Sequence, residues 1–152
     1  MRIGILALVG LTVLTLLARP LWENKVVVDS DLGRAHLPSR YFYQQCLQAG
    51  DTFTWCPGQF CGYFIHGEGQ GGYDHPIHRA LYTYLPLVPA FNLEVFLNYP
   101  FMLLGTYLFL RRHGLSRDIA LFGGLSFAFS GFNLPHYPHT NAIAIIAHPS
   151  SG

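Results

Sequence analysis

The stretch VPAFNLEVFLNYPFMLLGTYLFL, Val88 to Leu110, decides the fold of this chain of 152 residues. It is predominantly apolar, is interrupted by Glu94 and Pro100, and is followed by the basic sequence RRH. A transmembrane helix needs about 20 consecutive, mostly apolar residues. The stretch therefore predicts a helix that crosses a membrane.

Two further apolar runs lie on either side of this stretch. Ile3 to Ala18 is uncharged but short for a span, so a cleaved signal peptide is the alternative to a retained anchor. The following LLARPLW lacks the small-residue cleavage pattern, which favours the anchor. Ile119 to Leu134 is also nearly uncharged and follows Ser116, which can cap a helix. We therefore expect about three transmembrane helices.

The composition agrees with a membrane protein, since 51% of the residues are hydrophobic and 11% are charged. The net charge of +1 excludes binding of nucleic acid by charge alone. We predict an all-α membrane protein with a first helix at 1–18, an outer loop with short surface helices at 19–86 and a helix pair at 87–135. Residues 136–152 begin another apolar segment, so we expect the front part of a larger helical bundle.

The basic residues predict the orientation. The turn RRHGLSR, 111–117, carries three arginines and would face the cytoplasm, with Arg2 on the same side. The N-terminus is then cytoplasmic, and the loop 19–86 lies outside the membrane.

The outer loop contains two predicted helices. Ser39 to Ala49 has apolar residues at helical spacing and ends before Gly50, and His75 to Leu85 tolerates Pro76 in its first turn. Between them lies a glycine-rich loop with Cys56 and Cys61, which either form a disulfide or remain free thiols.

Charged residues gather directly after the first apolar run, in VVVDSDLGRAHLPSR, Val26 to Arg40. Asp29 and Asp31 could supply a carboxylate general base, although Asp, Ser and Gly also mark simple turns. Arg34 and Arg40 could hold a phosphate, since guanidinium groups bind phosphate in a bidentate fork, but interfacial arginines also bind lipid headgroups without catalysis.

Histidines and aromatic residues are the other notable groups. His75 with His78 and His136 with His139 could bind zinc, but no recognisable ligand motif is complete. We predict no metal site and no defined cofactor, and leave a divalent metal open. The aromatic residues of the outer loop either anchor it at the membrane interface or stack against sugar rings or a polyprenyl chain. These aromatic residues are Tyr41, Phe42, Tyr43, Phe53, Trp55, Phe60, Tyr63, Phe64 and Tyr73.

The order of several motifs resembles a known family. The segments LPSRYFYQQCLQAGDTFTWCPGQFCGY, GEGQGGYDHPIHRALYTYLPL, AFNLEV, LRRHGLSR and FAFSGFNLPHYPHTNAI follow an Asp-Leu pair behind the first span. This arrangement resembles the N-terminal part of bacterial YfhO-type membrane proteins, within the multispanning GT-C glycosyltransferases that use polyprenyl-phosphate sugars.

The resemblance implies a site in the outer loop, at the bacterial inner membrane. It assigns the catalytic aspartate to Asp31, with Asp29 as the less favoured choice, and gives Arg40, His139 and Asn141 substrate-facing roles. The implied partners are a lipid-linked sugar donor, membrane lipid and a cell-envelope polymer or lipid acceptor. At the C-terminus the chain departs from the family, because PSSG stands where relatives continue into a long apolar helix.

The predicted reaction is sugar transfer, with Asp31 as the general base and Arg34, Arg40 or His139 holding the donor phosphate. Two alternatives stay open at this point. The chain could bind or position lipid-linked intermediates without catalysis, or it could be an inactive truncated fragment.

Overall fold

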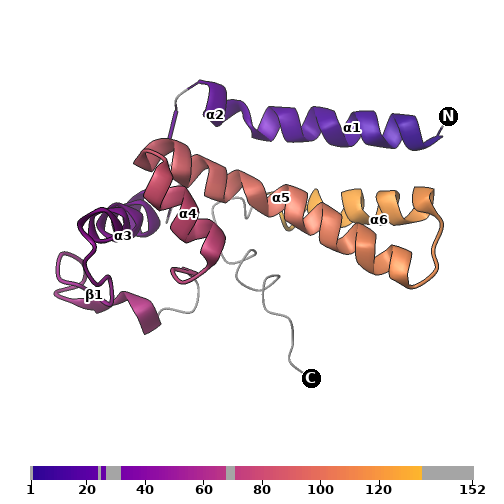
Figure 1. Ribbon diagram of the computed structural model, residues 1–152. Coiled ribbons are helices and arrows are strands. Elements are labelled where there is room, and N and C mark those ends of the chain that lie inside the picture. Colours follow the sequence, from indigo (N-terminus) through magenta and orange to yellow (C-terminus); the bar gives the residue numbers. More distant parts are fainter. Residues whose placement is uncertain (1, 24, 27–31, 68–70, 135–152) are drawn as a thin grey trace.

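The computed structural model of the chain describes residues 2–23, 25–26, 32–67 and 71–134. These residues are mostly helical, which confirms the all-α class. Within the described part there is one small sheet, an antiparallel pair of two-residue strands. The chain divides into two regions, a helical shaft and a headpiece (Figure 1).

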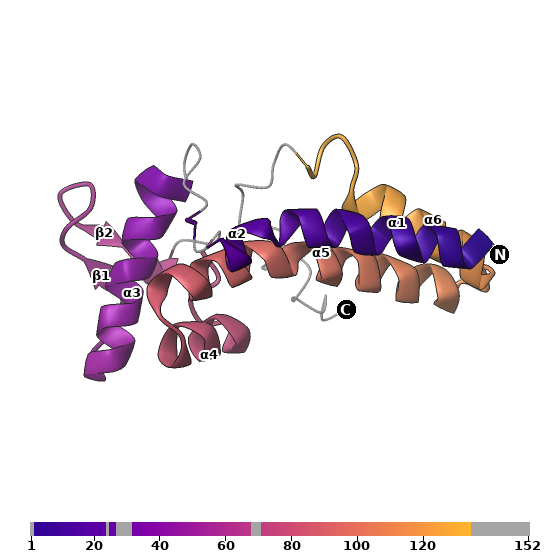
Figure 2. The ribbon, with the colours of Figure 1, turned by 90° about the horizontal axis from the view of Figure 1, so that it is seen from above.

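The helical shaft consists of α1 (Arg2–Leu17), α5 (Leu87–Arg112) and α6 (Arg117–Ala128). The three helices run alongside one another in both ribbon views, and both α1 and α5 contact α6 (Figures 1 and 2). The short helix α2 (Arg19–Trp22) follows α1 at the headpiece end of the shaft.

Helix α5 runs without a break from Leu87 to Arg112, through both Glu94 and Pro100. Among the described residues it is the one helix that is long and apolar enough to cross a membrane. The 16 residues of α1 and the 12 of α6 fall short of the roughly 20 that a span needs. The expected number of three spans therefore stays a prediction.

The turn between α5 and α6 follows the sequence signals closely. Gly114 has a φ of +83°, a conformation that glycine adopts without strain, and it ends α5. The Ser116 hydroxyl accepts a hydrogen bond from the Ile119 amide at 3.4 Å, as predicted for a cap. Gly124 then lets the two helices approach closely, because a Cβ atom there would lie 3.0 Å from the Leu103 carbonyl oxygen.

Helix α6 ends at Ala128, earlier than the predicted Leu134. The Asn133 side-chain amide donates to the Phe127 carbonyl at 2.6 Å, and the Ser130 hydroxyl accepts from the Asn133 amide at 3.2 Å. These side chains satisfy backbone groups that a longer helix would have paired, so the chain turns after Ala128.

The headpiece consists of residues 32–67 and 71–84. It begins with a single π-helical turn, η1 (Leu32–His36), which continues directly into α3 (Leu37–Ala49). The predicted helix at Ser39–Ala49 is confirmed, as is its stop at Gly50, whose φ is +68°. The second predicted helix is also confirmed, as α4 (Pro76–Tyr84), with Pro76 in its first turn.

A hairpin lies between α3 and α4 and was not predicted. Its strands are β1 (Trp55–Cys56) and β2 (Tyr63–Phe64), with Trp55 opposite Phe64, and the 3-10 turn η2 (Ile65–Gly67) follows. The structure contains Cys56 and Cys61 as free thiols, the first buried and the second exposed.

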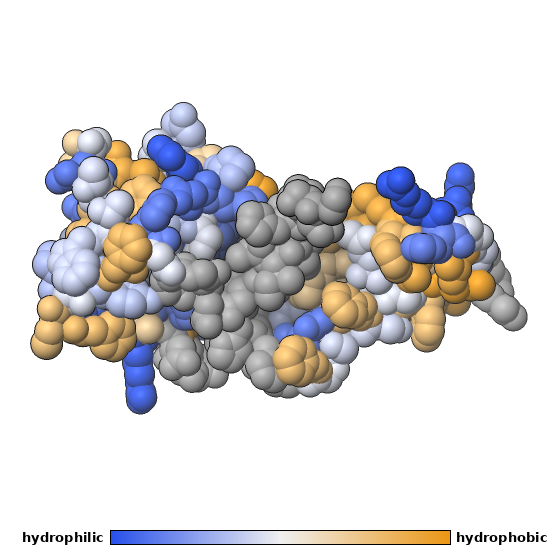
Figure 3. Space-filling view, turned by 90° about the horizontal axis from the view of Figure 1, so that it is seen from below, coloured by the Kyte–Doolittle hydropathy of each residue, from blue (hydrophilic) through white to orange (hydrophobic). Residues whose placement is uncertain are grey.

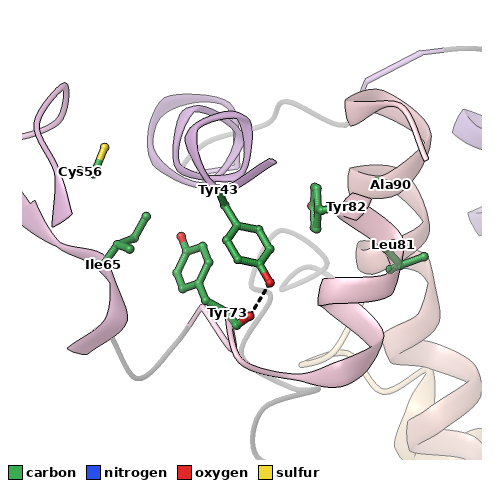
Figure 4. Packing of buried hydrophobic residues seen from close by; sticks show 7 residues of the cluster. All are labelled: Tyr43, Cys56, Ile65, Tyr73, Leu81, Tyr82 and Ala90. Carbon is green, nitrogen blue, oxygen red and sulfur yellow. Dashed lines mark hydrogen bonds between the residues drawn. The ribbon is translucent and has the colours of Figure 1, made fainter. Parts of the chain in front are cut away.

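The core of the headpiece is rich in tyrosine (Figure 4). Its buried members are Tyr43, Cys56, Ile65, Tyr73, Leu81, Tyr82 and Ala90. The Tyr43 hydroxyl donates to the Tyr73 carbonyl, and burial raises the pKa of Tyr43 to about 12. Since Ala90 belongs to α5, this core also packs the headpiece onto the first turns of the long helix.

The surface of the shaft is strongly apolar, and its buried interior is small. Large apolar side chains are exposed on all three helices, and they include Ile5, Leu8, Leu11, Leu16, Leu104, Leu108, Phe109, Phe122 and Phe127. In the space-filling view, orange hydrophobic patches lie on the described part of the shaft, with blue hydrophilic side chains at its far end, and the headpiece end is also mixed (Figure 3). Exposure of this extent on neighbouring helices indicates a surface that is covered by lipid or protein.

Candidate functional site

The polar centre of the molecule is an ion pair between the headpiece and α5. The Arg40 side chain is 1% exposed and the Glu94 side chain 0%. Arg40 Nε donates to Glu94 Oε2 at 3.0 Å, while Arg40 Nη2 donates to Glu94 Oε1 and to the Gly71 carbonyl. This is a bidentate contact, the strongest geometry for an arginine and a carboxylate.

Three tyrosine rings surround the guanidinium group. The Arg40 Cζ atom lies 4.3 Å from the ring centre of Tyr73, 5.5 Å from that of Tyr82 and 5.9 Å from that of Tyr43. A cation near aromatic faces is stabilised by the ring quadrupoles, and more so when water is excluded. The rings therefore support the buried positive charge.

The protonation states follow from these surroundings. Burial lowers the pKa of Arg40, but the Glu94 carboxylate together with Tyr82 and Tyr73 outweighs burial, so that the pKa is raised above its ordinary value. Burial and the neighbouring Glu94 raise the pKa of the Tyr82 hydroxyl well above its ordinary value. Tyr82 therefore stays protonated and donates a hydrogen bond to Glu94.

His78 is the fourth polar member of this cluster. Its Nδ1 lies 2.8 Å from the Gly72 carbonyl, which can only accept, so Nδ1 carries the proton. Its Nε2 lies 3.9 Å from Glu94 Oε1 and has no hydrogen-bond partner, and Arg40 Nη1 also has none. Burial lowers the pKa of His78, so the ring is neutral near pH 7 and its Nε2 is a bare acceptor.

A second group of contacts joins α5 to the segments that precede and follow residues 27–31. Leu32 is buried against Phe91 and Val95, with Val26 packed beside them. The Asn92 side-chain amide donates to the Lys25 carbonyl at 2.6 Å. The chain on both sides of residues 27–31 is therefore attached to the same part of α5.

The six predicted site residues do not form one described group. Asp29, Asp31, His139 and Asn141 lie outside the described residues. Arg34 is exposed on η1, where a phosphate group could reach it. Arg40 differs from the expectation of a substrate-facing residue, because its side chain is buried and already binds a carboxylate.

Sequence reasoning missed the partner of Glu94. Arg40 and Tyr82 from the headpiece are the hydrogen-bond donors to the Glu94 carboxylate. The available signal was the carboxylate itself, since an acidic residue in an apolar helix requires a partner. Nothing in the local sequence indicated that the partner would lie 54 residues earlier.

No described group of three or more His, Cys, Asp or Glu side chains could hold a metal ion. His75 and His78 do lie together, with ring centres 5.1 Å apart, but His78 Nδ1 is engaged by the Gly72 carbonyl. Comparison with known proteins found no match to a family model, a curated protein or a solved structure.

The first prediction concerns the ion pair. Arg40→Met should lower the free energy of unfolding by about 3–5 kcal/mol, because it leaves Glu94 buried without a counter-charge. The double variant Arg40→Met with Glu94→Leu should recover most of the loss, since no uncompensated charge remains. Denaturant unfolding in detergent micelles would measure all three proteins.

The matched control is Arg34→Met, which removes an exposed arginine from the adjacent turn and should change stability by less than about 0.5 kcal/mol. Equal losses for Arg34→Met and Arg40→Met would contradict the role assigned to the pair.

The second prediction concerns His78 and pH. Its pKa in the folded chain is lowered, so the unfolded chain binds the proton more readily. Its contribution to stability is therefore complete above about pH 6.5, the pKa of an unperturbed histidine, and is lost as the pH falls below that value. The titratable and charged groups that face His78 are Glu94, Arg40 and His75.

Thermal unfolding between pH 7.5 and 5.5 tests this. His78→Asn, which cannot titrate, should unfold with a weaker dependence on pH than the unchanged protein. His113→Asn alters an exposed histidine and should retain the original dependence. If His78→Asn left the pH dependence unaltered, neutral burial of His78 would be ruled out as its source.

Proposed function

We propose that this chain is the outer-loop region of a bacterial inner-membrane glycosyltransferase of GT-C type. In this proposal the shaft lies in the bilayer and the headpiece lies on the extracytoplasmic side. A sugar is transferred there from a polyprenyl-phosphate donor to a cell-envelope acceptor. The observation that carries the membrane part is the exposed apolar surface on all three shaft helices.

The charge distribution along the shaft supports the orientation. Arg111, Arg112 and Arg117 are exposed at the turn between α5 and α6, at the end opposite the headpiece. Basic residues near span ends favour the cytoplasmic side. With that turn inside, the headpiece faces outward, as does a sugar donor carried on a lipid in the outer leaflet.

The three-span arrangement belongs to this proposal. Helix α5 has the necessary length, and α1 and α6 are apolar helices packed along it. Shorter spans can be accommodated by local thinning of the bilayer or by flanking polar residues that extend to the interface.

The contacts around residues 27–31 support the position of the proposed site. Lys25 and Leu32, on either side of that segment, are attached to α5 within its first turns. This end of α5 would lie at the outer membrane surface in the proposed orientation. A lipid-linked phosphate would lie at the same depth, and Arg34 on the following turn is an exposed cation able to bind it.

The reaction would proceed at the anomeric carbon of the donor sugar. Asp31 accepts the proton of an acceptor hydroxyl, whose oxygen forms a bond to that carbon while the bond from the carbon to the phosphate oxygen breaks. The polyprenyl phosphate leaves with the electron pair, and Arg34, His139 and Asn141 hold the phosphate and the sugar. Arg40 supports this site indirectly, through the attachment of α3 to α5.

The orientation can be tested with the exposed thiol of Cys61, because Cys46 and Cys56 are buried. A membrane-impermeant maleimide should label Cys61 in intact cells. In a Cys61→Ser background, His113→Cys in the turn between α5 and α6 should react only after permeabilisation. The opposite topology would be indicated if His113→Cys were labelled in intact cells while Cys61 of the unchanged protein was labelled only after permeabilisation.

Catalysis can be tested by Asp31→Asn in the protein as it occurs in the cell. Loss of a general base should lower the transfer rate by about 10²–10⁴-fold at an unchanged protein level. Asp29→Asn is the matched control and should have a much smaller effect. Full activity of Asp31→Asn would favour the alternative function, in which the same surface binds lipid-linked intermediates without chemistry.

A further inference from the structure

The loop of the hairpin contains a strained turn. The turn begins at Gln59, whose carbonyl accepts a hydrogen bond from the Gly62 amide at 2.8 Å. Between these two residues, Phe60 has a φ of +51° and Cys61 a φ of +61°, values that residues other than glycine, asparagine and aspartate rarely adopt. Such conformations persist where the surrounding structure enforces them. Contacts outside the turn must therefore hold it in place.

The side chain of Gln59 supplies such contacts. Its Nε2 donates to the Ala35 carbonyl at 3.1 Å, and its Oε1 lies 2.6 Å from the Ser39 hydroxyl. That hydroxyl also lies 2.8 Å from the Ala35 carbonyl, so its single proton is available to either oxygen atom. Gln59, Ser39 and the Ala35 carbonyl together form the Gln59 contact. It joins the hairpin loop to η1 and to α3, which lies beside the hairpin in both ribbon views (Figures 1 and 2).

The Gln59 contact supports the chain where the regular helix is interrupted. Pro38 lacks an amide proton, so the Arg34 carbonyl cannot accept the usual α-helical hydrogen bond from four residues along the chain. A single π-helical turn, η1, lies at this position. Such turns are rare and occur frequently at functional sites. The side chains of Gln59 and Ser39 therefore add hydrogen bonds to a turn that has lost part of its backbone pattern.

Arg34 lies between two attachments of this turn. On one side Leu32 is buried against α5, and on the other side Ala35 is bonded to Gln59. The Arg34 side chain is exposed. Because both attachments lie within two residues of Arg34, they determine where its guanidinium group can reach.

We infer that Gln59 is a positioning residue for the binding of a lipid phosphate at Arg34. A guanidinium group binds phosphate through a fork of N–H donors, and affinity is higher when the backbone that carries it is already held in one place. Gln59 contributes no charge and acts through the Ala35 carbonyl. This inference rests on the phosphate-binding part of the proposed function and does not require the transfer reaction.

The test is the affinity of the full chain for decaprenyl phosphate in a neutral detergent, measured by native mass spectrometry. The phosphate monoester carries more charge than the diester of phosphatidylglycerol, and its chain can associate with the shaft, unlike inorganic phosphate. The unchanged protein should therefore bind decaprenyl phosphate more tightly than either of the other two.

Gln59→Leu should weaken the binding of decaprenyl phosphate about three- to tenfold. The apparent affinity falls in proportion to the fraction of chains whose turn is correctly placed, and this variant lowers that fraction. Amide hydrogen exchange of residues 32–36 should become faster in the same variant, because the turn loses a hydrogen bond.

Three further variants show how Gln59 acts. Ser39→Ala removes the other side chain of the Gln59 contact with a smaller change of volume and should also weaken binding, which guards against a folding artefact. Gln45→Leu makes the matched substitution at an exposed glutamine of α3 and should leave binding and exchange unchanged. In an Arg34→Met background, Gln59→Leu should have no further effect, because two residues that act through one group are not additive.

Three results would overturn the inference. One is equal affinity of Gln59→Leu, Ser39→Ala and Gln45→Leu for decaprenyl phosphate. Another is a loss of affinity on Gln59→Leu that is equally large with and without Arg34. The third is an unchanged protein that binds decaprenyl phosphate no more tightly than inorganic phosphate or phosphatidylglycerol.

The transfer reaction is tested separately by Asp31→Asn. If that variant kept full transfer activity while Gln59→Leu weakened binding as expected, the transferase proposal would fail and the positioning role would stand. If Asp31→Asn lost activity while Gln59→Leu bound decaprenyl phosphate normally, the positioning role would fail and the transferase proposal would stand.

Discussion

The bidentate contact between Arg40 and Glu94 determines how the two regions of this protein are joined. Neither charge has access to water, so each is tolerated only because the other is present. Tyr82 occupies a further lone pair of the carboxylate, and three tyrosine rings enclose the guanidinium. Movement of α3 away from α5 would separate these charges, and this restricts the headpiece to one position on the long helix.

The restricted position has a consequence for the remainder of the outer loop. Helix α3 continues without interruption from η1, whose first residue, Leu32, is buried against Phe91 and Val95 of α5. Glu94 lies between these two residues in sequence and contacts Arg40. One short stretch of α5 therefore fixes both the start of the headpiece and the first turn of α3.

Much of the fold could be predicted from the sequence because it depends on local signals. Gly50, Pro76, Gly114 and Ser116 each mark a helix end through their own backbone or side-chain chemistry, and each lies at the expected helix boundary. The hairpin could not be predicted in this way. Strands of two residues are too short to show alternation, and their pairing depends on the core beneath Cys56 and Ile65.

The candidate site was less accessible to prediction from the sequence. The proximity of Arg34 and Arg40 in sequence suggested a common phosphate site, but η1 and α3 are helical, and they place one arginine outside and the other in the core. The contact between Arg40 and Glu94 is non-local, and no periodicity in either segment encodes it. The sequence shows which residues are charged, but tertiary packing decides which of these side chains face solvent and which are buried.

The position of Glu94 within an apolar helix also constrains biosynthesis. A carboxylate that enters a membrane alone is costly, even near the end of a span. Because a chain is synthesised from its N-terminus, Arg40 leaves the ribosome 54 residues before Glu94. In the proposed orientation, α3 would therefore already be outside the membrane when α5 inserts. Arg40 would then be available to pair with Glu94 as soon as the nascent helix enters the membrane.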